Sequence, residues 1–148
     1  MSKIIQMILS GIFFTFILDF FLFLGLKLNY IDAHQIDIYY NAFFAYNQSI
    51  VLFVLFALVI GFIVMYADTR LAVITVGTLF IMVFATLIPS VGSALGSFLF
   101  MKKGITVATD RFTYHGDLLY SGRKKVWFYD LELKKVIILD KNKIQGEY

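Results

Sequence analysis

The chain has 148 residues, of which 60% are hydrophobic, and its mean hydropathy is +0.82. Soluble domains contain about 45–50% apolar residues, so this composition argues against a soluble domain and is typical of a chain whose solvent is lipid. Ten of the thirteen Lys and Arg residues lie at or beyond Lys102, so the positive charge is concentrated in the C-terminal tail. The chain has no cysteine, which excludes disulfides, thiolate metal sites and cysteine nucleophiles.

The first apolar block, Ile4 to Leu26, predicts a membrane span. Its length of about 23 residues is enough for the roughly 30 Å of hydrocarbon in a bilayer. No cleavage site of small residues closes the block, so we expect an uncleaved anchor and not a secretory signal. The following segment, residues 28–49, combines tyrosines with apolar residues, which predicts a partly helical loop on the membrane surface.

The second block, Ile50 to Ala67, predicts the second span, and the polar turn from Asp68 to Arg70 makes the chain run back antiparallel. The third block, Leu71 to Met101, has about 31 residues, and as one straight helix of roughly 46 Å it would exceed the hydrocarbon thickness. It contains Pro89, the only proline of the chain. A proline removes a backbone donor and kinks a helix.

Two structures fit this third block. In the favoured one, a single helix is kinked at Pro89 and its end emerges from the bilayer, because the part after the proline is too short to cross alone. In the other, a span from Leu71 to Ile88 precedes a short half-helix or re-entrant segment from Ser90 to Met101. The choice between three and four crossings, and with it the side of the N-terminus, stays open.

From Lys102 onward the chain changes to short β-rich runs separated by Gly, Asp and Asn turns, which predicts a small antiparallel meander. We therefore expect two domains, a transmembrane helical domain of residues 1–101 and a β-rich cytoplasmic domain of residues 102–148. A sheet of this size is marginal by itself, so it should lean on the membrane, on a partner or on copies of itself.

Alternation along the strands assigns side chains to the two faces of this sheet. The expected buried face carries Val126, Phe128, Val136 and Ile138. Trp127 and Tyr129 would then face the membrane or a partner. Together with the basic run, this predicts a docking surface for lipid headgroups or a protein partner, made of Arg123, Lys124, Lys125 and Trp127.

The orientation follows from the positive-inside rule, by which Lys and Arg beside a span favour the cytoplasm. Lys102 and Lys103 follow the third block directly, so we expect the tail to be cytoplasmic. Lys outnumbers Arg, and Ile, Phe, Tyr and Asn are abundant, which hints at an AT-rich bacterial genome. The expected location is therefore the bacterial inner membrane.

Asp19 is the one acid inside the first block. A carboxyl group in an apolar span costs a few kcal/mol, so it should face protein or water. One interpretation is an ion or proton site, and the other is a hydrogen-bonded carboxyl near the interface. The ion site leads to an alternative function, a subunit of a small oligomeric channel or transporter that uses Asp19 and the hydroxyl-rich third block.

Small residues recur along the third block at helical spacing and include a GxxxG sequence. Such residues let two helix backbones approach closely, so they predict a packing seam within the chain or in an oligomer. The seam consists of Ala85, Pro89, Gly92, Ser93, Gly96 and Ser97.

Asp32, His34 and Asp37 combine two carboxylates and an imidazole, but their spacing matches no metal motif, and a metal site needs converging ligands with outer support. His115 precedes a Gly-Asp pair that is typical of a hairpin turn. The sequence has no nucleophile motif, no phosphate loop and no recognisable pair of catalytic carboxylates. We therefore expect no enzyme activity, metal or cofactor.

The main hypothesis is a small non-enzymatic membrane protein that acts as an assembly or interaction subunit. Its helices would pack through the Gly/Ser seam into a homo-oligomer or a larger membrane complex. Its β tail would dock a cytoplasmic partner or the membrane surface. Nothing in the sequence indicates nucleic acid as a partner.

Overall fold

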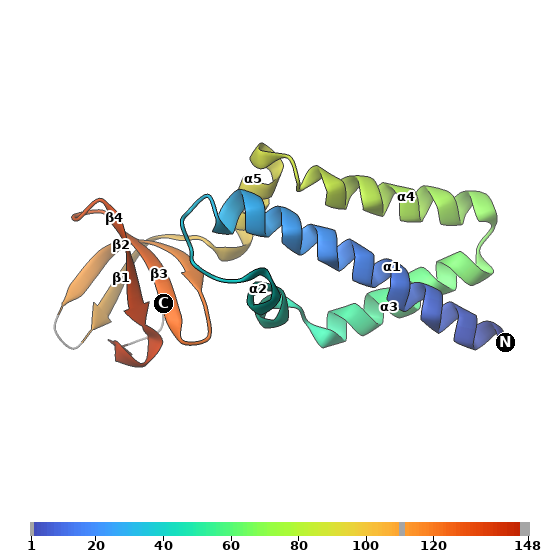
Figure 1. The fold of residues 1–148 in the computed structure, drawn as a ribbon, viewed down its shortest axis with the longest axis horizontal. Helices are drawn as coiled ribbons and strands as arrows, with labels where there is room; N and C mark the ends of the chain where they lie inside the picture. Colours follow the sequence, from blue (N-terminus) through green and yellow to red (C-terminus); the bar gives the residue numbers. More distant parts are fainter. Residues whose placement is uncertain (1, 110–111, 146–148) are drawn as a thin grey trace.

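A computed structural model describes residues 2–109 and 112–145 of the chain. Figure 1 shows a helical region with a small sheet at one of its ends, and the N-terminus lies at the other end. The helices are α1 (Lys3–Leu26), its π-helical continuation η1 (Lys27–Ile31), α2 (Tyr40–Asn47), α3 (Ile50–Tyr66), α4 (Thr69–Ala85) and α5 (Pro89–Phe100). The strands are β1 (Lys102–Thr109), β2 (Thr113–Ser121), β3 (Lys125–Asp130), β4 (Lys135–Asp140) and β5 (Ile144–Gln145). The expected order of helices followed by an antiparallel sheet is confirmed.

The long helices α1, α3 and α4 lie side by side, with α1 between the other two (Figure 1). Glycines permit the close approach of α1 and α3. A Cβ atom on Gly11 would run into the carbonyl oxygen of Ala57, and one on Gly61 would run into that of Met7. Small residues at a helix crossing allow backbones to touch in this way. This crossing was not among the expected packing seams.

Length and composition allow between one and three membrane crossings among the described residues. The continuous helix from residue 3 to residue 31 is long and apolar enough to cross alone. The other two candidates are bent pairs, α2 with α3 at 82° and α4 with α5 at 89°, and each is long enough to cross only when its two helices are taken together. The short helices α2 and α5 therefore turn away from the direction of the long helices they adjoin.

Pro89 begins a helix and does not kink one. Helix α4 ends at Ala85, a turn follows, and Pro89 takes the first position of α5. A proline fits there because the first turn of a helix needs no backbone donor from it. The favoured expectation of one kinked helix does not match this break. The alternative, a shorter span followed by a short second helix, describes it better.

The sheet is antiparallel, with five strands in the order β4-β3-β2-β1-β5. A 3-10 turn, η2 (Lys141–Lys143), leads the chain from β4 to β5, which pairs with β1. One face of the sheet covers its own core of Val107, Leu118, Val126 and Phe128. A shift of register between Leu118 and Tyr120 accompanies the change to the other face. That second face packs against the helices through Leu119, Tyr120 and Trp127.

Two expectations about this sheet are wrong. On strand β4 the core face carries Ile137 and Leu139 in place of the expected Val136 and Ile138. The reason is the register, in which Phe128 pairs with Ile137 and Val126 pairs with Leu139. Val136 therefore belongs to the helix-facing side, and the Ile138 side chain is 54% exposed. Trp127, expected to face a membrane or partner, is 6% exposed and packs against the helical region of its own chain.

Candidate functional site

An aromatic cluster joins the helical region to the sheet. We call it the aromatic junction, and it consists of Tyr30, Phe43, Phe100, Tyr120 and Trp127. The Phe100 and Tyr120 rings are 5.5 Å apart, and the Tyr120 and Trp127 rings are 5.8 Å apart. Rings at these distances attract each other beyond their burial of apolar area. The junction thus connects η1, α2 and α5 with β2 and β3.

Two hydrogen bonds cross the aromatic junction. The Tyr30 hydroxyl donates to the carbonyl oxygen of Leu119 at 2.8 Å, and the amide of Asn47 donates to the Tyr120 hydroxyl at 2.9 Å. Burial raises the pKa of the Tyr120 hydroxyl, and the hydrogen bond from Asn47 partly opposes this shift. Buried polar groups that are satisfied in this way favour one particular arrangement of the two regions.

The GxxxG sequence contacts the chain itself. A Cβ atom on Gly96 would overlap the ring of Tyr30, and one on Gly92 would overlap the Thr86 carbonyl oxygen and the Asn29 side chain. Asn29 also donates a hydrogen bond of 2.9 Å to the Thr86 carbonyl oxygen. The two glycines therefore seat α5 against η1.

The rest of the predicted seam does not form one stripe. Ala85 ends α4, Pro89 begins α5, and the axes of these two helices differ by 89°. Ser93 and Ser97 are half-buried on α5. An oligomeric contact through these six residues stays a prediction, but Gly92 and Gly96 are already covered within the chain.

Asp19 has a polar partner from the segment between α2 and α3. The side-chain amide of Gln48, which follows α2, donates to the Asp19 carboxylate at 2.8 Å. Close by, the Tyr40 hydroxyl donates to the Phe20 carbonyl oxygen at 2.8 Å. Both bonds hold the end of α1 against α2, so Asp19 has a structural role. Its use as an ion or proton site stays a prediction.

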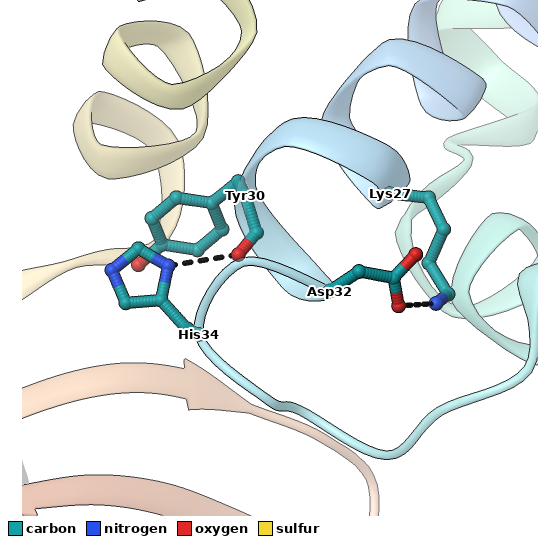
Figure 2. A network of polar contacts seen from close by, with 4 residues as sticks. All are labelled: Lys27, Tyr30, Asp32 and His34. Atoms are coloured by element: carbon teal, nitrogen blue, oxygen red, sulfur yellow. Dashed lines mark hydrogen bonds and ion pairs between the residues drawn. The ribbon is translucent and has the colours of Figure 1, made fainter. Parts of the chain in front are cut away.

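The histidines do not converge with carboxylates. Figure 2 shows that the His34 ring lies beside Tyr30, whose carbonyl oxygen accepts a 2.8 Å hydrogen bond from His34 Nδ1. In the same view, Lys27 and Asp32 form an ion pair. His115 bonds to the Thr106 hydroxyl on the sheet. Among residues 2–109 and 112–145, no group of three or more His, Asp or Glu side chains could hold a metal ion.

The basic run, Arg123 to Lys125, covers the end of the β2–β3 turn and the first residue of β3, and it faces the segment around α2. We call the space between them the basic groove; it is a cavity of about 380 Å³, within the size range of small-ligand sites. Its charged residues are Arg123, Lys124, Lys125 and Asp37, and its aromatic residues are Tyr39, Tyr46 and Trp127. The Arg123 guanidinium lies 4.7 Å from the centre of the Tyr46 ring. The predicted docking residues are thus brought together, with Trp127 contributing from a buried position.

Sequence reasoning missed the residues that join the two regions. Tyr30 and Leu119 are 89 positions apart in the sequence, and no local pattern links them. Asn47 and Tyr120 are 73 positions apart. The only available signal was the concentration of tyrosines in residues 28–49. Comparisons of this chain with family models, curated proteins and solved structures give no match.

Proposed function

We propose that this protein is a non-enzymatic membrane subunit that assembles with copies of itself or with other membrane proteins. In this proposal α1, α3 and α4 lie in the bilayer, and the sheet is held at the membrane surface. The sheet then presents its outer side and the basic groove to partners. The proposal assigns no reaction to the chain.

The observation that carries the proposal is the outer surface of the long helices. Helix α3 is apolar on every side, yet most of its large side chains are exposed. Exposed residues on α3 include Ile50, Val51, Leu52, Val54, Leu55, Phe56, Leu58, Val59 and Phe62. A helix that is apolar all round belongs in a protein core or in lipid, and a large exposed apolar patch marks a membrane or protein contact. Lipid together with neighbouring subunits would cover these side chains.

The shape of the chain supports a fixed position for the sheet. The sheet lies at one end of the helical region, and the N-terminus and the turn between α3 and α4 lie at the other (Figure 1). In the proposed orientation the sheet end is cytoplasmic, because Lys102 and Lys103 begin the first strand. A reporter fused to the C-terminus should give a cytoplasmic signal. A periplasmic signal would reverse the orientation.

Assembly can be tested on protein extracted from membranes together with its lipid. Native mass measurement should find more than one copy of the chain, or the chain with another membrane protein. A particle that contains one copy and no partner would contradict the proposed function. Because Gly92 and Gly96 contact η1, the contact between subunits would use exposed side chains such as Phe13 and Phe16 on α1.

A second candidate, a channel or transporter subunit, is favoured by one observation. The Thr15 hydroxyl is buried without a hydrogen-bond partner in the described part of the chain, and Thr15 lies one helical turn from Asp19. Polar groups inside a span suggest an ion pathway. Liposomes that contain the protein should then show ion or proton flux that Asp19→Asn reduces. Equal leakage with wild type, with Asp19→Asn and without protein would remove this candidate.

A further inference from the structure

We propose that the basic groove binds the phosphate of an anionic phospholipid in the bilayer that holds the helices. This inference rests on the proposed membrane insertion and goes beyond it by assigning a ligand class to one place. The basic groove lies where the helical region meets the sheet. One wall is the β2–β3 turn and the other is the segment from Asp37 to Tyr46.

Charge is the first argument. Arg123, Lys124 and Lys125 line the groove against one acid, Asp37. The ion pairs found within residues 2–109 and 112–145 are Lys27 with Asp32 and Lys143 with Asp140, so neither engages the three cations. The side chains of all three are exposed. An anion can therefore approach them without breaking an existing ion pair.

The second argument is the level of the groove along the molecule. Tyr46, which lies under the Arg123 guanidinium, is four positions before Ile50, where the exposed apolar helix α3 begins. If α3 starts at the edge of the hydrocarbon, the groove lies at the level of the headgroups. Lys and Arg at that level attract anionic lipid, and tyrosines are enriched there because the ring is half-buried and the hydroxyl is wet.

The aromatic side chains supply the third argument. Tyr39 is 80% exposed and Tyr46 is 43% exposed, so both rings are available at the rim of the groove. Trp127 lines the groove from a buried position, and its indole nitrogen has no hydrogen-bond partner in the described structure. The cations suit a phosphate, and the aromatic rings suit the interfacial region of a lipid beside its headgroup, whereas a free anion would use the cations alone.

The experiment uses the full-length protein in a neutral detergent. Trp127 is the only tryptophan, so its fluorescence reports on the groove directly. Short-chain phosphatidylglycerol is titrated into the sample, with short-chain phosphatidylcholine and inorganic phosphate as parallel probes. We expect phosphatidylglycerol to change the fluorescence at the lowest concentration of the three probes.

A matched pair of variants separates the groove from net charge. Lys124→Gln/Lys125→Gln removes two cations from the groove, and Lys134→Gln/Lys135→Gln removes two exposed cations from the region of the β3–β4 turn. The first variant should weaken the binding of phosphatidylglycerol by roughly 10- to 30-fold. The control variant should bind within about twofold of wild type, since its lysines do not line the groove. Thermal unfolding should confirm that both variants fold.

Several outcomes would overturn the inference. These are an equal loss in both double variants, equal binding of the zwitterionic lipid, or binding of inorganic phosphate as tight as that of the lipid. A separate measurement, extraction of cell membranes with alkaline carbonate, tests insertion itself. Release of the chain by carbonate would contradict the proposed function, whereas retention without lipid selectivity would contradict only the lipid site.

Discussion

The long helices and the sheet bury their apolar side chains in different ways. On α3, residues such as Leu55 and Val59 point outward and only a narrow strip around Ala57 and Gly61 is covered by α1. On β3, the consecutive residues from Val126 to Phe128 are all buried, because the sheet has a core on one face and the helices on the other. The apolar side chains of the sheet are covered by residues of the same chain, whereas those on the outside of the helices are left for lipid or another protein to cover.

This difference indicates where the chain should be sensitive to substitution. At the aromatic junction and at the glycine contacts the side chains are closely packed against protein. A substitution there that adds or removes side-chain volume therefore creates a clash or a cavity that lipid cannot relieve. On the outer face of α3, one apolar side chain can replace another at little cost if lipid surrounds the helix. The following predictions test that contrast, beginning with the largest expected effect.

Trp127→Ala should have the largest effect, because it removes a large buried side chain from the aromatic junction. We expect a loss of about 3–5 kcal/mol in the free energy of unfolding, which is typical of such truncations. Limited proteolysis in detergent should show cleavage of the sheet at protease concentrations that leave the wild type intact. Tyr39→Ala, at a side chain that is 80% exposed, is the control and should resist the protease as the wild type does.

Gly96→Leu should separate α5 from η1, because the new side chain would occupy the position of the Tyr30 ring. Overpacking of this kind costs about 1–3 kcal/mol, so the melting temperature in detergent should fall by roughly 5–10 °C. Gly77→Leu is the matched control on α4, since a Cβ atom at Gly77 meets nothing within 4 Å. Equal melting temperatures for the two variants would contradict the close contact of Gly96 on α5 with Tyr30 on η1.

Tyr30→Phe should have a smaller effect, because it keeps the ring and removes only the hydroxyl that donates to Leu119. A buried carbonyl oxygen that loses its donor costs about 1–3 kcal/mol. Amide hydrogen exchange of β2 should accelerate in this variant. Tyr66→Phe, at a side chain that is 49% exposed on α3, should leave that exchange unchanged.

High pH should loosen the aromatic junction slightly through Tyr120. Burial raises the pKa of its hydroxyl above the ordinary value of 10.0, so the folded chain holds this proton more tightly than the unfolded chain. The corresponding stability is fully present below pH 10 and is lost as the pH rises through the folded pKa. The melting temperature of the wild type should therefore fall more steeply above pH 10 than that of Tyr120→Phe. Parallel curves would exclude a contribution from this hydroxyl.

The apolar blocks predicted the long helices closely, since Ile4 to Leu26 became α1 and Ile50 to Ala67 became α3. Continuous apolar runs of this length have few alternatives to a helix. The break before Pro89 was harder to predict, because a proline can either kink a helix or begin the next one. After the break, Gly92 packs against the Asn29 side chain, and no local sequence pattern links these two distant positions.

The existence of the sheet was predicted from the sequence, but its two faces were predicted only in part. The run from Val136 to Leu139 is apolar at four consecutive positions, so alternation gives no phase for β4. On β3, alternation correctly placed Val126 and Phe128 in the sheet's own core, but it could not show that helices cover Trp127 on the other face. The basic residues Arg123 to Lys125 could be singled out because their charge is visible in the sequence, and their role as a docking surface stays a prediction. The proximity of Arg123 to Tyr46 depends on the fold and could not be predicted from the sequence.

The central claim is that lipid covers the exposed helices and water surrounds the sheet, and cysteine labelling tests it most directly. The chain has no cysteine of its own, so single cysteines can be introduced cleanly. Val59→Cys on α3 and Ile138→Cys on β4 are matched, because the replaced side chains are 48% and 54% exposed. In opened membranes a water-soluble maleimide should label Ile138→Cys rapidly and Val59→Cys hardly at all, since the reactive thiolate forms in water and not in hydrocarbon. Equal labelling of the two cysteines in these opened membranes would contradict the claim.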